Sequence, residues 1–370
     1  MNFDHSHYVP CLRWKMGEYQ AVLRLHYTTK KMLTPLIQIP EIGYDFKEKR
    51  LKKTMDEHLK DFVSKKIYKK WGSSFCFVDL KLVGLSARLE NGTHPVKYVF
   101  DDLRKVRISA TPVTGLDRDR AFQQEIREIL AKDHRGVCLR ISIEEAAKSE
   151  SVGKINSLLS KLHIKPNYCD LVLDLSAPDN FEPLDGFAKA IQAIVSRTPY
   201  LEKWRTFSIL GTSFPDSMGG MKLGVNTIRR CEWELYKVMV ANFRRANLRL
   251  PTFGDYAISH PTISEHDMRL MKPSAKIRYT TNNSYFVSKG HNIRDDRYGK
   301  NKQYHNLCKK VIESQHYRGS EFSWGDEYIQ QCANGGKPGS LTTWVTVDTN
   351  HHIEKVTQDI ANFYASVNTV

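Results

Sequence analysis

The sequence predicts an α/β protein whose main part is a (β/α)₈, TIM-barrel-like fold. Three observations lead to this fold class: eight short apolar runs, amphipathic helical stretches between them, and several runs that are apolar throughout. Strands that are covered on both faces in a parallel sheet have such continuous apolar runs. The eight predicted strands are residues 8–14, 33–39, 75–80, 106–113, 137–141, 171–175, 206–210 and 252–258.

Helical stretches separate these strands. One apolar stripe at helical spacing joins Phe122, Ile126 and Ile129, and another joins Phe187, Ile191 and Ile194. Further helices are predicted over residues 17–27, 50–70, 94–104, 144–162 and 227–246. This alternation indicates a parallel sheet, and eight strands favour its closure into a barrel; the alternative is an open, doubly wound parallel sheet.

The last third of the chain departs from this rhythm. Residues 275–281 and 284–288 predict a hairpin across the pair Asn282-Asn283, and a helix over 299–316 follows. The stretch 322–347 is predicted to be rich in loops. We therefore predict three parts, which are a barrel over residues 1–259, a cap or insertion over one barrel mouth at 260–347, and a terminal helix over 348–370 that packs on the barrel.

Composition excludes several classes of protein. No run approaches the roughly 18 apolar residues of a membrane span, and the first ten residues lack the apolar core of a signal peptide. The seven cysteines include no CxxC pair, which favours buried thiols in a reducing compartment over disulfides or a zinc site. We expect a cytoplasmic protein with no membrane partner.

Charge points to an anionic partner. The 56 Lys and Arg residues exceed the 41 Asp and Glu residues, which leaves a net charge of +15. Such an excess favours a phosphate-containing ligand, either a nucleotide or a nucleic acid. Residues 47–70 contain ten of the basic residues, and they are either a nucleic-acid contact or a solvated outer helix face.

Ionisable residues end many of the predicted strands. In barrels of this type, function lies at the C-terminal ends of the strands, and an ionisable side chain there is costly unless it is paired or solvated in a cleft. Asp79 and Asp174 each interrupt an apolar run, and we predict that they act as metal ligands or as general acid/base groups. The structural alternative is a salt bridge from these carboxylates to Arg140 or Lys15.

Arg140 and Lys15 would add positive charge at the same barrel mouth. Arginine suits bidentate capture of phosphate or carboxylate, and lysine acts as a point charge, so we predict that both bind substrate. A divalent metal such as Mg²⁺ is the cofactor that these carboxylates suggest, and no organic cofactor is indicated.

Six further residues are weaker candidates. Glu41 follows Pro40, Asp255 follows Gly254 and His260 precedes Pro261, which suits catalytic groups on loops, although glycine and proline also simply end strands. In the predicted cap, Arg278, Tyr279 and Trp324 suit stacking on a base or sugar; their structural alternative is core packing.

Familiar catalytic signatures are absent. The sequence contains no GxxxxGK[ST], GxSxG or HExxH motif and no GxGxxG after a strand. P-loop NTPases, α/β-hydrolases, zincins and Rossmann enzymes therefore lose support.

A series of segments in order along the chain resembles the "beta protein" family of phages and bacteria. These segments are YVPCLRWKMGEY (8–19), PLIQIPE (35–41), FVDL (77–80), TPVTGLDR (111–118), RGVCLRI (135–141), LVLDL (171–175), FGDYAISHP (253–261), IRYTT (277–281), FSWGD (322–326), LTTW (341–344) and TNHH (349–352). The resemblance implies a barrel-like fold and a context of phage genomes and bacterial mobile or defence loci. It implies no reaction.

Together these observations favour an enzyme, a metal-assisted hydrolase or phosphodiesterase that acts on a phosphate-containing substrate at the C-terminal mouth of the barrel. One alternative is a non-catalytic binding or sensor protein in phage–host conflict, with a protein partner encoded in the same locus. Another is a nucleic-acid binder that uses residues 47–70.

Overall fold

Eight parallel strands close into a barrel in the computed structural model, which describes residues 3–262 and 272–367. The order around the barrel is β1-β11-β9-β8-β7-β6-β5-β2, and β2 pairs with β1 to close it. The strands are β1 (Tyr8–Leu12), β2 (Leu36–Gln38), β5 (Cys76–Asp79), β6 (Ala110–Thr114), β7 (Val137–Ser142), β8 (Cys169–Ser176), β9 (Thr206–Gly211) and β11 (Thr252–Asp255). This closure confirms the predicted barrel and excludes the open doubly wound sheet.

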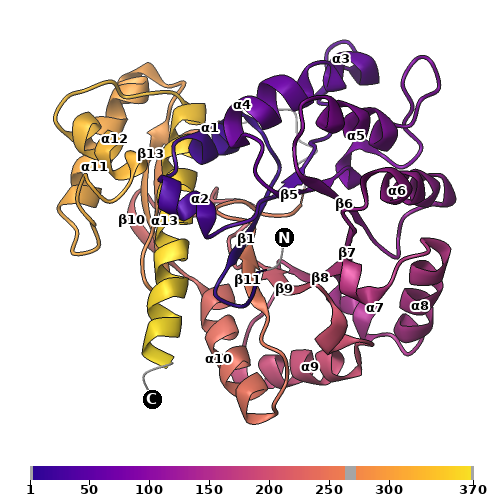
Figure 1. Ribbon diagram of the computed structural model, residues 1–370. Coiled ribbons are helices and arrows are strands. Elements are labelled where there is room, and N and C mark those ends of the chain that lie inside the picture. The colour runs from indigo at the N-terminus through magenta and orange to yellow at the C-terminus, as the bar shows by residue number, and fades with distance from the viewer. Residues whose placement is uncertain (1–2, 263–271, 368–370) are drawn as a thin grey trace. The chain divides into compact units, whose positions relative to one another are not determined.

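Continuous burial explains why the strands were predictable. All residues of β1, β2, β5, β6, β9 and β11 are buried, as expected for strands covered on both faces. Helices α5, α6, α8 and α9 surround the strands (Figure 1). Each of the eight predicted apolar runs contains or overlaps one barrel strand.

The helices of the barrel form where the sequence supplies caps and apolar stripes. In α6 (Arg120–Asp133), the Asp119 side chain accepts a hydrogen bond from the backbone N–H of Phe122 at 2.7 Å and caps the helix. The other helices are α3 (Met55–Leu59), α4 (Lys69–Trp71), α5 (Pro95–Lys105), α7 (Ile143–Ala147), α8 (Ser151–Lys161), α9 (Leu184–Arg197) and α10 (Cys231–Arg245). A π-helical segment (Phe62–Tyr68) precedes α4, and β3 (Tyr44–Asp45) pairs with β4 (Arg50–Leu51).

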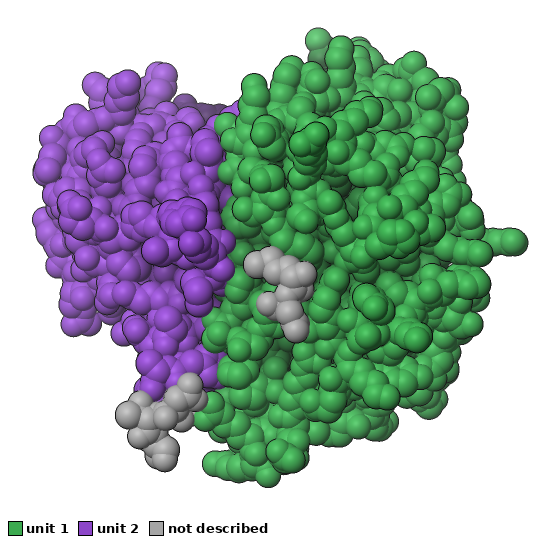
Figure 2. Space-filling model, in the orientation of Figure 1, with its two compact units in different colours: residues 1–14, 33–211, 234–255 green, residues 15–32, 212–233, 256–370 purple. Residues whose placement is uncertain are grey.

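The chain divides into two compact units, which Figure 2 colours separately. The first unit comprises residues 1–14, 33–211 and 234–255, and it contains all eight barrel strands. The second unit comprises residues 15–32, 212–233 and 256–370. The predicted location of residues 260–347 over the barrel mouth, and of residues 348–370 against the barrel, stays a prediction.

A three-stranded antiparallel sheet and a set of helices form the second unit. The sheet order is β10-β13-β12, with β10 (Gly224–Arg229), β12 (Ser274–Thr280) and β13 (Ser284–Asn292). The helices are α1 (Met16–Leu23), α2 (Tyr27–Lys31), α11 (Gln303–Ile312), α12 (Trp324–Ala333) and α13 (Leu341–Val367). Strands β12 and β13 confirm the predicted hairpin, whose turn lies between the paired residues Thr280 and Tyr285.

Two local predictions in this unit were wrong. Residues 227–229 form the end of the edge strand β10, and the helix predicted from 227 begins at Cys231. The stretch 322–347, predicted as loops, contains α12 and the first residues of α13. Strand β10 was hard to predict because its residues alternate only between half-buried and exposed.

Helix α1 packs closely on α13. A Cβ atom at Gly17 would lie 2.4 Å from Cγ1 of Val345, so only glycine allows this approach. The Asn350 side chain donates to the carbonyl oxygen of Ala21 at 3.1 Å. The Glu354 carboxylate accepts hydrogen bonds from Thr29 and from the backbone N–H of His26. Segments more than 300 residues apart in the sequence therefore share one core.

No helix within residues 3–262 and 272–367 has the length and hydrophobicity that a membrane span requires.

Candidate functional site

Three of the predicted site residues meet inside the barrel. Asp79 is the last residue of β5, Arg140 lies on β7 and Asp174 lies on β8. Nη1 of Arg140 donates to Asp79 Oδ2 at 3.0 Å, while its Nε and Nη2 donate to Asp174 Oδ2 at 2.9 and 2.7 Å. Because β5 lies two strands from β7 in the barrel order, the Arg140 side chain points into the barrel interior.

A second arginine, which lies outside the predicted strand ends, joins this group. Arg118 lies four residues beyond β6, and its Nη2 is 3.3 Å from Asp79 Oδ1. Its Nη1 pairs with Asp117, which also binds Lys81 Nζ at 2.6 Å. These six residues, Lys81, Asp79, Asp117, Arg118, Arg140 and Asp174, are called the strand-end cluster below.

Backbone groups fix the two central carboxylates. The backbone N–H of Lys81 donates to Asp79 Oδ1 at 2.9 Å, and that of Ser176 donates to Asp174 Oδ1 at 2.8 Å. In each case the donor lies two residues further along the chain, a local bond that aspartate side chains favour at the end of a strand. The carboxylates are therefore held before any ligand arrives.

Close backbone packing brings the Arg118 loop to β7. A Cβ atom at Gly115 would lie 2.8 Å from the carbonyl oxygen of Arg140, so this position of the TPVTGLDR segment requires glycine. Burial acts to raise the pKa of Asp117, but the charges of Arg118 and Lys81 outweigh it, and the pKa lies below its ordinary value. Asp117 is thus an anion that balances the cluster.

Accessibility separates the members of the strand-end cluster. The side chains of Asp79 and Arg118 are 0% and 1% exposed, whereas those of Arg140 and Asp174 are 10% and 12% exposed. A ligand can therefore approach Arg140 and Asp174 more readily than the other two. The arrangement offers one guanidinium for anion binding and one carboxylate for proton transfer.

The predicted metal site at Asp79 and Asp174 stays a prediction. Both oxygens of Asp79 accept from arginine side chains, so a metal ion at this carboxylate would have to displace a guanidinium group. In the described parts of the chain, no group of three or more His, Cys, Asp or Glu side chains could hold a metal ion. The observed geometry is the salt-bridged alternative for Asp79 and Asp174 with Arg140.

Two other candidates lie elsewhere in the first unit. Asp255, the buried last residue of β11, accepts a hydrogen bond of 2.5 Å from the hydroxyl group of Tyr8. Glu41 lies in the loop after β2 and is close enough to His58 to raise its pKa, although burial of His58 has the larger, opposite effect. Catalytic roles for Glu41 and Asp255 stay predictions.

Lys15 and His260 belong to the second unit. Lys15 is exposed and precedes α1, and its backbone N–H donates to Glu18 Oε2 at 3.2 Å. The Nδ1 atom of His260 accepts from the backbone N–H of Thr262 at 3.2 Å. Neither residue is placed relative to the strand-end cluster, and their roles stay predictions.

The three candidates of the predicted cap contact three different partners. Arg278 on β12 pairs with Asp348 at 2.7 Å, and Arg24 lies over the Trp324 ring at 4.6 Å. Tyr279 is buried in the core of the second unit. Their described contacts are those of a packed core, and their binding of a base or sugar stays a prediction.

Tyr279 belongs to a buried network that joins three of the family-like segments. Its hydroxyl donates to Asp326 Oδ1 at 2.6 Å, and its ring stacks on His351 with centroids 3.8 Å apart. The two ring nitrogens of His351 lie 2.7 Å from Asp326 Oδ2 and 2.9 Å from the carbonyl oxygen of Thr280. Both neighbours offer acceptor oxygens, and a ring that carries a proton on each nitrogen would donate to both and pair with the carboxylate of Asp326.

Electrostatics of this network agree with a structural ion pair. Burial acts to raise the pKa of Asp326, but the His351 charge and hydrogen bonds from two hydroxyl groups outweigh it, and the pKa is lowered. Burial and the Asp326 charge raise the pKa of Tyr279, so its phenol stays protonated and donates. The side chains of Asp326 and His351 are 0% exposed, which separates them from any ligand.

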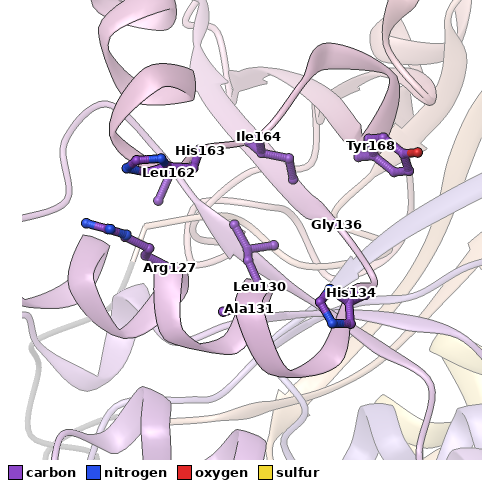
Figure 3. Close-up of a pocket in the computed structure, with 9 residues that line it drawn as sticks. All are labelled: Arg127, Leu130, Ala131, His134, Gly136, Leu162, His163, Ile164 and Tyr168. Atoms are coloured by element: carbon purple, nitrogen blue, oxygen red, sulfur yellow. The ribbon is translucent and has the colours of Figure 1, made fainter.

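A groove of about 560 Å³ lies at the other end of the barrel, beside the first residues of β7 and β8. Figure 3 shows Leu130 and Ile164 near its centre, with Arg127 and His163 on one side and His134 and Tyr168 on the other. A Cβ atom at Gly136 would lie 2.0 Å from the carbonyl oxygen of Tyr168, so the groove wall depends on a glycine with a φ of +79°. Since barrel enzymes act at the opposite end, this groove is not the predicted site.

Comparison with known proteins confirms the family resemblance. A family model described as Beta protein matches residues 8–358. No curated protein matches the chain.

Two solved structures are similar at low identity. Alanine racemase from Clostridium difficile 630, in complex with cycloserine, is 12% identical with a TM-score of 0.30; the match covers 75% of this chain and 59% of the racemase. The enoyl reductase domain of MlnA from the macrolactin biosynthesis cluster of Bacillus amyloliquefaciens is 10% identical with a TM-score of 0.37; the match covers 97% of this chain and 94% of that domain. Similarity at this level does not extend to activity.

Proposed function

The chain belongs to the Beta protein family, and we propose that it binds and hydrolyses a phosphate-containing substrate, a nucleotide or a nucleic acid, at the C-terminal ends of its barrel strands. The observation that carries this proposal is the strand-end cluster, in which Arg140 bridges carboxylates from two other strands. Barrel enzymes place their chemistry at this end of the strands. The net charge of +15 supports an anionic substrate, since it attracts one from a distance.

Each residue of the cluster has a distinct proposed role. Arg140 binds the phosphate oxygens, and Asp174 moves the proton that hydrolysis requires, because these two side chains are the more accessible. Asp79 is a positioning residue that orients Arg140 and Arg118. A metal-dependent reaction would require Asp79 to exchange an arginine for the metal, so the assays include Mg²⁺.

A non-catalytic role is the second candidate, and one observation favours it. The carboxylates of Asp79, Asp117 and Asp174 all have cationic partners within the barrel, as in a closed structural network. In that role the protein is a cytoplasmic binding or sensor protein in phage–host conflict, with a partner encoded in the same locus.

Binding and turnover assays on matched variants test the proposal. The probes are ATP and a single-stranded oligonucleotide, each with and without Mg²⁺, and mass spectrometry of ligands that co-purify with the protein extends the set. Arg140→Gln should weaken binding at least tenfold, which corresponds to the loss of one charge-assisted hydrogen bond. Asp174→Asn should abolish turnover while binding persists.

Arg205→Gln is the matched control. Arg205 pairs with the buried Asp170 at the start of β8, so its loss removes a similar buried ion pair at the other end of the barrel. It should lower stability but leave the affinity for the probe unchanged in folded protein.

The outcomes separate the candidates. Binding without turnover in the wild type favours the non-catalytic role. Binding that depends steeply on salt but not on Arg140 assigns the contact to residues 47–70 and contradicts the proposed site.

A further inference from the structure

A polar pocket of about 340 Å³ lies in the second unit, beside the turn between β12 and β13. The turn residues 281–284 form one wall, and residues 315–318, between α11 and α12, form another. Lys355 on α13 completes the lining, which includes no acidic side chain among the described residues. The volume is at the lower end of the range for small-molecule sites.

Lys355 is a buried cation in this wall. It is 2% exposed, and its Nζ pairs with Asp359, one turn further along α13. Burial lowers the pKa of Lys355; the Asp359 charge opposes this effect, whereas the Arg230 and Arg318 charges add to it. Lys355 is thus a buried cation that is paired with one carboxylate while two arginine charges lie nearby.

Arg230 shares the same carboxylate. Its Nη1 binds Asp359 Oδ2 at 2.7 Å and also donates to the carbonyl oxygen of Thr281 at 2.7 Å, which fixes the turn. Its Nε and Nη2 have no hydrogen-bond partner among the described residues, although the side chain is 0% exposed. Two buried cations thus share Asp359, and Arg230 Nε also lies 3.8 Å from Glu232 Oε1.

A third cation, Arg318, faces the pocket from the loop. Its Nη2 donates to the side chain of Gln358 at 2.7 Å, and its backbone N–H donates to Tyr279 at 2.9 Å. The remaining lining consists mainly of amides, hydroxyl groups and His316. Such a lining supplies hydrogen bonds to a compact anion and to the hydroxyl groups of a polar carrier.

We infer that this pocket binds the phosphoryl group of a small phosphorylated molecule, with Lys355 and Arg318 as its cationic partners. A phosphoryl group in the pocket would add negative charge beside three cations, Lys355, Arg230 and Arg318, near which lie the carboxylates of Asp359 and Glu232. The small volume favours a sugar phosphate over a polymer. This site is independent of the proposed function, since it uses no residue of the strand-end cluster.

Calorimetric titration of the full chain at low ionic strength tests the inference. The probes are inorganic phosphate, ribose 5-phosphate and uncharged ribose. The wild type should bind the two phosphates and not ribose. Arg318→Gln should weaken ribose 5-phosphate binding at least tenfold, while Lys309→Gln, the same charge change at an exposed position of α11, should leave it unchanged.

Two further variants complete the experiment. Lys355→Met should also weaken ribose 5-phosphate binding. If this variant does not fold, the result for Arg318→Gln alone tests the inference. Absence of phosphate binding at millimolar concentration overturns the inference. The inference is also overturned if Arg140→Ala abolishes phosphate binding and Arg318→Gln leaves it unchanged, because the phosphate then occupies the barrel site.

Discussion

Replacement of His351 by glutamine should destabilise the second unit severely. The change keeps a polar side chain of similar size but removes the imidazole that pairs with Asp326, which is buried with it. Breaking a buried ion pair by removing one partner costs about 3–5 kcal/mol, because the other charge stays uncompensated. Loss of the stacking contact with Tyr279 adds to this cost.

A double-mutant cycle isolates the pair. Asp326→Asn together with His351→Gln removes both charges, so the double variant should lose less stability than the two single variants together. The expected coupling energy is about 1–3 kcal/mol. His134→Gln, at an exposed position on the barrel, is the control and should change stability by less than about 0.5 kcal/mol.

Urea unfolding followed by tryptophan fluorescence measures these free energies, since Trp324 and Trp344 report on the second unit. Two results would contradict the proposed pair: a cost of less than about 1 kcal/mol for His351→Gln, or single-variant losses that add without coupling. Either result would mean that the TNHH and FSWGD segments are not joined by a structural ion pair.

Three other comparisons test the barrel by equilibrium unfolding. Gly136→Ala should cost more than about 2 kcal/mol of stability, because its Cβ atom meets a backbone oxygen. Gly72→Ala, at a φ of +84° with no atom within 4 Å, should cost about 1–2 kcal/mol. Equal losses for the two variants would contradict the packing argument. Tyr8→Phe removes a donor to the buried Asp255 and should cost about 1.5–3 kcal/mol, and an unchanged unfolding midpoint would show that this bond contributes nothing. Burial lowers the pKa of His7 from 6.5 to about 4, so the folded state excludes a proton that the unfolded state binds. Stability should therefore fall as the pH drops from about 6.5 towards 4, and between pH 7.5 and 4.5 the wild type should lose about 2.5 kcal/mol more than His7→Gln; parallel pH profiles for the two proteins would contradict this assignment.

The barrel was predictable because its strands are buried on both faces. Each apolar run is recognisable by itself, and no long-range information is needed to find it. The convergence of Asp79, Arg140 and Asp174 followed from the same pattern, since the ends of parallel strands meet at one end of a barrel.

The contact between Arg118 and these residues was harder to predict from the sequence. Arg118 lies beyond its strand, and its only signal in the sequence was its place after Asp117 in the TPVTGLDR segment. A loop arginine is ordinarily solvated, but the loop packs closely on β7 at Gly115, and Arg118 there contacts the buried Asp79. Whether the carboxylate of Asp79 is free to react or is held in a salt bridge depends on this contact with Arg118.

The predictions for two elements of the second unit failed for a different reason. Strand β10 is an edge strand with little buried surface, so its sequence has no apolar alternation to detect. Helix α12 begins with Trp324-Gly325, and that glycine is required because a Cβ atom would lie 2.5 Å from the carbonyl oxygen of Val347. Tertiary packing, rather than helix propensity, selected this residue.

The division of the chain has a consequence for its synthesis. The chain passes between the two units five times, and α1 and α2 find their partners on α13, more than 300 residues later. During translation, the early segment 15–32 therefore waits with its apolar surface uncovered until almost the whole polypeptide has left the ribosome. Neither unit can be lost or exchanged as a single genetic insertion, so the two units are expected to be inherited together.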